Sequence, residues 1–308
     1  REPYVGEFVP TRDESAFEPP QPDDFVPRRL KKRPSQALEL RVTDFKAYLE
    51  CPYRFLLGRL LYLESLDDAA EELDGGTFGT LAHEVLREFA LGPQRDGADP
   101  EALRADLDHR LQTLVAARFG AHPRPAVLVQ VEQLRRRLNA FADRQAARVA
   151  QGWRIFYVED AAKPQRVQLD LDGRPFTLIG RIDRIDRHFE TGRFEIFDYK
   201  TGDRGTAPGK AHHNRSGWVD FQLPLYRHLA RPLGVEEDVG LGYIVLPKDV
   251  SQVDFLLADW SDDELREADE FAWEVARNIR DEQFQPIAAR PTYNDDPYAR
   301  ICQVGVLR

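Results

Sequence analysis

Residues 180–202 read GRIDRIDRHFETGRFEIFDYKTG, and their alternation of apolar and polar residues predicts two strands joined by a tight turn. The turn is expected at residues 190–192, which read Glu-Thr-Gly. Because strand side chains alternate between two faces, Asp198 and Lys200 point the same way. With this turn Asp183 lies opposite Asp198, and directly opposed side chains are roughly 5 Å apart. Two carboxylates at that spacing can bind one divalent cation.

A simpler interpretation of the same residues is a surface hairpin with a salt bridge between Asp198 and Lys200, since carboxylates beside lysines are commonly no more than that. Against it, residues 194–197 read Phe-Glu-Ile-Phe, a run rich in strand formers that predicts a buried strand. Ionised groups in a buried strand need partners or a metal ion. The residues by themselves leave both interpretations open.

The two arms together resemble a known family. G-R-I-D-R-I-D followed after a turn by F-D-Y-K-T-G is similar to the PD-(D/E)XK nuclease superfamily in its RecB-like branch. The resemblance implies an α/β fold, in which helices flank a central mixed β-sheet (the restriction-endonuclease-like core), with an added helical portion. It also implies that Asp183, Asp198 and Lys200 are catalytic. The two Asp residues, with the backbone carbonyl of Tyr199, would then bind Mg²⁺ or Mn²⁺.

Asp186 competes with Asp183 for this role because R-I-D occurs twice. The two Asp residues are three apart on a strand and therefore face opposite ways. Gly180, three residues before Asp183, matches the G-x-x-D spacing of the family. This resemblance selects Asp183, and a register shift or bulge would undo the choice.

A second motif lies on a predicted helix that starts near residue 77, T-F-G-T-L-A-H-E-V-L-R-E-F-A. Its helical period predicts a buried stripe of Phe78, Leu81, Ala82, Val85 and Phe89. His83 lies at the edge of that stripe, where a structural role is the first expectation from the residues alone. However, F-G-T-L-A-H-E-V-L resembles the RecB-like motif in which a helical His binds the metal ion. The resemblance therefore implies that His83 is a metal ligand.

A third motif lies in F-Q-L-P-L-Y-R-H-L, which predicts a helix on which Gln222 and Tyr226, four residues apart, share a face. Such a pair is common in helices. It also resembles the Q-x-x-x-Y motif that follows D-x-K in RecB-like nucleases. This resemblance implies that both residues support the site and contact DNA, which we expect to be single-stranded there.

The remaining chain is organised around these motifs. Residues 1–36 carry many prolines and acidic residues without an apolar period, which predicts a linker or extended arm. Residues 37–308 form the expected nuclease domain, with a helical insertion at about 95–151 and a catalytic core at about 153–258. Long helices are expected at 99–118, 125–151 and about 261–283, and another from Thr43 to Leu61 with an interruption at Pro52.

The chain most resembles the C-terminal nuclease domain of AddB-type helicase-nuclease subunits. Its cysteine content differs from that of many of these relatives. Those relatives hold an iron-sulfur cluster with four cysteines. Cys51 matches the first position and Cys302 the last, whereas Tyr293 and Asp296 occupy the two between. Two thiolates do not supply the usual four ligands, so we expect no cluster and regard Cys51 and Cys302 as vestigial positions.

Charge and composition limit the class of protein. The net charge of -10 and the pI near 5.3 argue against a wholly basic nucleic-acid coat, although a locally basic groove is compatible with a nuclease. No signal peptide or long apolar segment is present, so we expect an intracellular chain without membrane contact, cytoplasmic and nucleoid-associated. Because the chain begins at Arg1 rather than Met, we expect a piece of a longer protein.

The resemblance thus implies a Mg²⁺- or Mn²⁺-dependent deoxyribonuclease, an exonuclease rather than an endonuclease. We expect it to serve a helicase-nuclease in double-strand-break processing and recombinational repair, with a helicase portion or partner subunit. One alternative is a stand-alone phage- or CRISPR-associated RecB-like exonuclease. Another is a non-catalytic DNA-binding or scaffolding module, against which the full set of matching motif residues argues.

Overall fold

Two mixed β-sheets form the centre of the part of the chain that the structure, a computed structural model, describes: residues 38–63, 75–160, 162–215, 217–236 and 238–285. The larger sheet runs in the order β10 (Asp254–Leu257), β9 (Gly240–Val245), β6 (Phe194–Lys200), β5 (Arg184–His188) and β2 (Trp153–Val158). In it β6 and β9 are parallel, and the other neighbours are antiparallel. The smaller sheet runs in the order β1 (Leu38–Arg41), β4 (Arg174–Gly180) and β3 (Gln165–Leu171).

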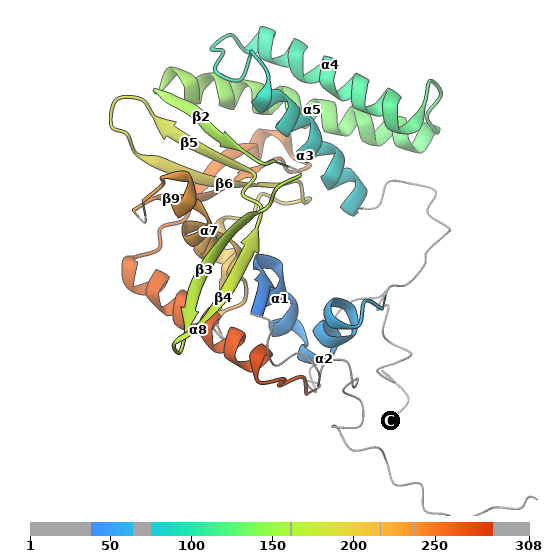
Figure 1. The fold of residues 1–308 in the computed structure, drawn as a ribbon. Coiled ribbons are helices and arrows are strands. Elements are labelled where there is room, and N and C mark those ends of the chain that lie inside the picture. Colours follow the sequence, from blue (N-terminus) through green and yellow to red (C-terminus); the bar gives the residue numbers. More distant parts are fainter. Residues whose placement is uncertain (1–37, 64–74, 161, 216, 237, 286–308) are drawn as a thin grey trace, which may run out of the picture. The chain divides into compact units, whose positions relative to one another are not determined.

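Helices cover both faces of the larger sheet (Figure 1). On one face lie α3 (Gly75–Leu91), α4 (Pro100–Phe119) and α5 (Pro125–Ala150), which share a buried apolar core with strands β2, β6 and β9. On the other lies α7 (Gln222–Ala230), which also contacts α8 (Asp262–Arg280). The expected restriction-endonuclease-like α/β fold is confirmed. The expected buried stripe of α3 is confirmed as well, because all five of its residues are buried.

The first strand of the hairpin predicted within residues 180–202 begins later than the sequence pattern indicated. Strand β4 ends at Gly180 and β5 begins at Arg184, and the two strands belong to different sheets. Residues 181–183 are the crossing between them. As a result Asp183 lies just before β5 rather than inside it.

The early helix also differs from its prediction. Residues 38–41 form β1 beside β4, and α1 (Val42–Glu50) begins one residue before Thr43, the expected cap. The backbone N–H of Arg41 donates to Asp44 Oδ2 at 2.8 Å. The interruption at Pro52 is confirmed, because α2 (Pro52–Phe55) starts there and a π-helical turn (Leu56–Leu60) follows.

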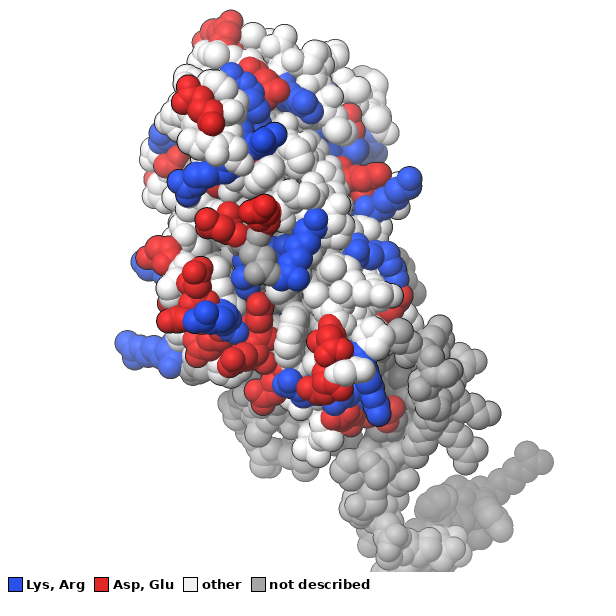
Figure 2. All heavy atoms as spheres, turned by 60° about the vertical axis from the view of Figure 1, so that its left-hand side comes forward, with Lys and Arg blue, Asp and Glu red and all other residues white. Residues whose placement is uncertain are grey.

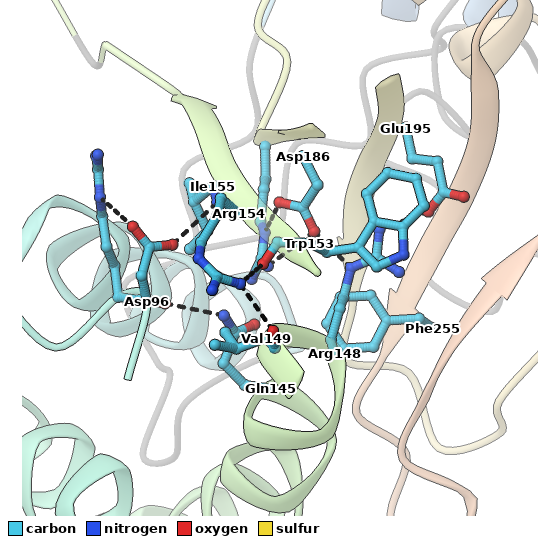
Figure 3. Close-up of polar contacts among 12 residues, drawn as sticks. Asp96, Gln145, Arg148, Val149, Trp153, Arg154, Ile155, Asp186, Glu195 and Phe255 are labelled. Carbon is cyan, nitrogen blue, oxygen red and sulfur yellow. Dashed lines mark hydrogen bonds and ion pairs between the residues drawn. The ribbon is translucent and has the colours of Figure 1, made fainter. Parts of the chain in front are cut away.

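A buried ionic cluster joins α5 to the larger sheet (Figure 3). Arg148 Nε lies 2.6 Å from Asp186 Oδ2, and its Nη2 donates to Glu195. Arg184 Nε donates to Asp186 Oδ1 at 2.6 Å. The Arg148 guanidinium also packs on the rings of Trp153, Phe197 and Phe255. This cluster ties the helical portion to β5 and β6 on the face away from α7.

The surface carries mixed charge. On the face drawn in Figure 2 basic and acidic side chains are interspersed rather than gathered into separate regions. Every helix in the described ranges is too short or too polar to cross a lipid bilayer. The predicted arm at residues 1–36 and the Cys302, Tyr293 and Asp296 positions lie outside the described residues.

Gly180 leaves no room for a side chain, which yields a test of this packing. A Cβ on Gly180 would lie 2.4 Å from Leu229 Cδ1 and 2.8 Å from Val42 Cγ2. We expect Gly180→Ala to lower the free energy of unfolding by about 1–3 kcal/mol, measured by urea denaturation. Gly202→Ala is the matched control, because its nearest heavy atom would be 4.0 Å away. Equal stability of the two variants would contradict the packing argument.

Candidate active site

The C-terminal end of β6 carries the first two predicted residues. Asp198 is 3% exposed, and its Oδ2 lies 2.7 Å from Lys200 Nζ. The sequence had left open a simple surface salt bridge, but all residues from Glu195 to Tyr199 are buried. A carboxylate in this position loses its hydration and must be compensated by neighbouring groups.

Asp183 reaches the same end of the hairpin from the crossing between the sheets. The β5–β6 register pairs Arg184 with Phe197, so one step further Asp183 lies opposite Asp198, as the sequence indicated. The backbone N–H of Tyr199 donates to Asp183 Oδ2 at 2.8 Å. This hydrogen bond holds the Asp183 carboxylate against the end of β6.

His83 approaches from α3 and joins the two carboxylates. Its Nδ1 lies 3.4 Å from Asp183 Oδ2, and its Nε2 lies 3.1 Å from the carbonyl oxygen of Tyr199. Burial alone would lower the pKa of the His83 imidazole, but the carboxylates of Asp183 and Asp198 outweigh it and raise that pKa to about 9. At neutral pH the ring is therefore protonated, and both nitrogens donate.

Helix α7 supplies the residues that hold Asp198. Gln222 Nε2 donates to Asp198 Oδ1 at 2.7 Å, and the hydroxyl of Tyr226 donates to the same oxygen at 3.2 Å. The pair shares a helix face, as its spacing predicted, and Gln222 Nε2 lies 2.8 Å from the Tyr226 hydroxyl. Burial raises the pKa of Tyr226 well above its usual range, so the hydroxyl stays protonated and able to donate.

Lys200 lies between Asp198 and α7. Its ammonium donates to Gln222 Oε1 at 3.1 Å, in addition to the ion pair with Asp198. Burial would lower the pKa of Lys200, but the carboxylate of Asp198 outweighs burial and raises it. The side chain therefore acts as a fixed positive charge at neutral pH.

The chemistry of these groups fits a hard divalent cation. Burial, and next the negative charge of Asp183, raise the pKa of Asp198. Asp198 Oδ2 is buried and makes no hydrogen bond beyond its ion pair with Lys200. These oxygens and the Tyr199 carbonyl are donors that Mg²⁺ and Mn²⁺ prefer.

The expected metal ligands do not, however, surround one point. Among the described residues no three His, Cys, Asp or Glu side chains converge as they would around a metal ion. In the structure His83 is paired with Asp183, and Asp198 is held by α7 and Lys200. The metal-ligand roles of His83, Asp183 and Asp198 therefore stay predictions.

Asp186, the competitor of Asp183, does not belong to the site. Its carboxylate is fully buried on the opposite face of the sheet, bound to Arg148 and Arg184. The two copies of R-I-D thus send one Asp to each face, as strand alternation requires. Cys51 lies between α1 and α2, with its backbone carbonyl accepting from the N–H of Phe55 at 2.9 Å.

Several residues around the site were missed from sequence. Asp220 Oδ1 accepts from the backbone N–H of Gln222 at 2.9 Å, and Asp220 Oδ2 pairs with Lys46 at 3.2 Å. An Asp side chain that accepts the backbone N–H two residues on forms an Asx turn, which is a local signal. Arg137 of α5 donates to the carbonyls of Thr201 and Leu246, the residues that follow β6 and β9. Nothing local distinguishes Arg137 from its exposed neighbours in sequence.

Comparison with known proteins identifies the family of the chain. A family model of the PD-(D/E)XK nuclease superfamily matches residues 39–304, and the chain belongs to that superfamily. Comparison with curated proteins gives no significant match. Among solved structures, the one titled "Crystal structure of SSO0001" is similar at 14% identity and a TM-score of 0.36, over 89% of this chain and 91% of that one.

The protonated His83 gives a pH test of the site's electrostatics. Its pKa is higher in the folded chain, about 9, than the ordinary value of 6.5, so its stabilising contribution is complete below about pH 6.5 and disappears as pH rises through about 9. In buffer with EDTA, the free energy of unfolding should therefore fall over this interval by roughly 1–2 kcal/mol more than in His83→Gln, allowing for solvent screening of the partly exposed ring.

Urea denaturation at a series of pH values measures both proteins. Any titration elsewhere in the chain is common to wild type and variant, so only the difference between them reports on His83. Parallel pH profiles of the two proteins would contradict the ion pair with Asp183.

Proposed function

We propose that this protein is a metal-dependent DNA nuclease, the nuclease part of a helicase-nuclease that processes double-strand ends. The observation that carries the proposal is the joining of two carboxylates and a lysine at the end of one hairpin: Asp183 opposite Asp198, with Lys200 2.7 Å from Asp198. Membership in the PD-(D/E)XK superfamily supports hydrolysis of phosphodiester bonds in DNA.

Asp183, Asp198 and the Tyr199 carbonyl would hold Mg²⁺ or Mn²⁺, with His83 as a further ligand once its ring is deprotonated. A bound cation would lower the pKa of a water molecule and offset negative charge on the phosphoryl group. The chain's own part is to keep these oxygens together. The Tyr199 N–H fixes Asp183, and Gln222 with Tyr226 fixes Asp198.

Lys200 supplies positive charge to the reacting phosphate. Because Asp198 raises the pKa of Lys200, the ammonium is suited to orienting water and stabilising negative charge, and poorly suited to removing a proton. The Lys200 side chain is 38% exposed, so a substrate can reach it.

The resemblance of the motifs to RecB-like and AddB-type nucleases supports the finer parts of the proposal. It favours exonuclease action on single-stranded DNA, in double-strand-break repair by recombination, with a helicase portion or partner subunit. Gln222 and Tyr226 would then also contact the strand beside Asp198. Time courses with 5′- or 3′-labelled single- and double-stranded DNA test exonuclease against endonuclease action.

The two R-I-D copies give a paired test of the catalytic assignment. We expect Asp183→Asn to lower the cleavage rate by about 10²–10⁴-fold with little loss of folding, because it removes charge at the site. Asp186→Asn should instead lower the free energy of unfolding by about 3–5 kcal/mol, because Arg184 and Arg148 lose a buried partner. At a temperature where it is folded, it should cleave within about tenfold of wild type. Loss of cleavage in folded Asp186→Asn together with near wild-type cleavage in Asp183→Asn would contradict the assignment of Asp183.

Substitution of Lys200 distinguishes a catalytic nuclease from a non-catalytic DNA-binding or scaffolding module. With Mg²⁺ or Mn²⁺ the wild type should degrade DNA, EDTA should stop it, and Lys200→Ala should lower the rate by about 10²–10⁴-fold, since the ammonium stabilises developing charge. Lys163→Ala is the matched control, because Lys163 is exposed and distant in sequence from the motifs. Cleavage that continues in EDTA, or that Lys200→Ala leaves unchanged, would contradict the mechanism.

A further inference from the structure

Lys200 has a third contact, with a residue that no sequence motif indicated. Its Nζ lies 4.9 Å from the centre of the Tyr243 ring, a distance at which an ammonium is attracted to an aromatic face. Tyr243 lies on β9, where the parallel register pairs it with Asp198. The ring is therefore beside the Asp198–Lys200 ion pair, on the same sheet.

Tyr243 is itself fixed by a buried histidine. Tyr243 is 2% exposed, and its hydroxyl lies 2.5 Å from Nε2 of His212, which is fully buried at the end of α6 (Pro208–His212). The other ring nitrogen of His212, Nδ1, lies 2.8 Å from the backbone carbonyl of Asp220. The ring of Trp260 packs edge-on against the imidazole, with centroids 5.2 Å apart.

These contacts define the proton positions. A carbonyl oxygen only accepts, so Nδ1 of His212 carries the proton and donates to Asp220. In the neutral ring Nε2 is then an acceptor, and the Tyr243 hydroxyl donates to it. Burial lowers the pKa of His212, in agreement with a neutral ring. A phenol that donates its proton in a hydrogen bond has a more electron-rich ring, which strengthens its attraction for a cation.

The same segment also supports the other neutral partner of Lys200. Asp220, whose carbonyl holds His212, accepts the backbone N–H of Gln222 through its Oδ1. Gln222 Oε1 in turn accepts from Lys200. His212, Asp220 and Gln222 therefore connect the Tyr243 ring with the amide that accepts from the Lys200 ammonium. A lysine side chain is a flexible four-carbon stem, and such fixed neighbours restrict where its charge lies.

We propose that Tyr243 and His212 are positioning residues for Lys200: His212 fixes the ring of Tyr243, and that ring holds the ammonium between Asp198 and Gln222. The inference rests on the proposed function, in which Lys200 acts on the reacting phosphate. The competing explanation is a buried tyrosine whose hydroxyl is satisfied by the nearest acceptor, as buried tyrosines require. The two explanations differ in whether the ring affects Lys200.

The kinetic test compares Tyr243→Leu, which removes the ring, with Tyr243→Phe, which keeps it. With single-stranded oligonucleotide and Mg²⁺, we expect Tyr243→Leu to lower kcat by about tenfold with KM changed less than about twofold, whereas Tyr243→Phe stays within about threefold of wild type. Phe255→Leu is the control for loss of a core ring, because Phe255 packs on Phe197 at the opposite face of the sheet. Equal kcat in Tyr243→Leu and Phe255→Leu would overturn the proposal.

A second measurement is independent of cleavage. The ring current of Tyr243 should displace the ε-methylene NMR resonance of Lys200, which is assigned by its loss in Lys200→Arg. We expect the displacement to persist in Tyr243→Phe and to vanish in Tyr243→Leu. If wild type shows the displacement but cleaves no DNA, the proposed function fails and the contact stands. If wild type cleaves DNA without the displacement, the positioning role fails.

His212→Asn tests the link without removing the Tyr243 ring. The shorter amide can still donate to the Asp220 carbonyl, but it does not reach the Tyr243 hydroxyl. Because this variant breaks the same hydrogen bond as Tyr243→Phe and keeps the ring, we expect a similar loss of kcat, about two- to threefold, and a partial change in the Lys200 resonance. If Tyr243→Leu does not fold, His212→Asn tests whether the contacts of Tyr243 affect Lys200. An unchanged kcat and resonance in folded His212→Asn would overturn the role of His212.

Discussion

The arrangement of elements around β6 depends on the free-energy cost of burying a charged carboxylate in the larger sheet. Asp198 is almost fully buried on β6, where an isolated carboxylate would lose several kcal/mol of hydration. It is retained because Gln222 and Tyr226 of α7 donate to it and Lys200 supplies positive charge, while the backbone N–H of Tyr199 donates to the neighbouring Asp183. Helix α3, α7 and the crossing between the sheets must therefore meet at one point. The break between β4 and β5 is what allows Asp183 to arrive there.

The same constraint acts on the other face of the sheet, with a different result. The repeat R-I-D-R-I-D has a period of three, whereas a strand has a period of two, so consecutive copies place their carboxylates on opposite faces. Asp183 faces the open end of the hairpin, and Asp186 faces α5, where Arg148 and Arg184 enclose it. Two chemically identical triplets thus place one buried carboxylate beside His83 and the N–H of Tyr199, and the other between Arg148 and Arg184. The two Asp residues have different partners because different elements cover the two faces of the sheet, whereas the two triplets have the same sequence.

Local patterns predicted most elements because they depend on neighbours in sequence. The stripe of α3, the turn after His188 and the pair Gln222 and Tyr226 follow from periods of 3.6 and 2. Features that depend on distant residues were not predictable. The close approach of Leu229 and Val42 to Gly180 depends on distant parts of the chain, and so does the contact of His212 with Tyr243, which are 31 residues apart. Sequence also gave no sign that the expected metal ligands bind one another.

The pairing of the expected metal ligands with one another follows from the balance of charge at the site. Asp183 and Asp198 bring two negative charges to the site, and Lys200 and protonated His83 bring two positive charges. A divalent cation placed between the carboxylates would face the His83 imidazolium at short range, so its binding requires that this ring release its proton. Lys200, which keeps its charge beside Asp198, need not change. The imidazolium thus lies beside a carboxylate that the proposed function assigns to the metal ion, and a cation bound there would compete with the proton on His83.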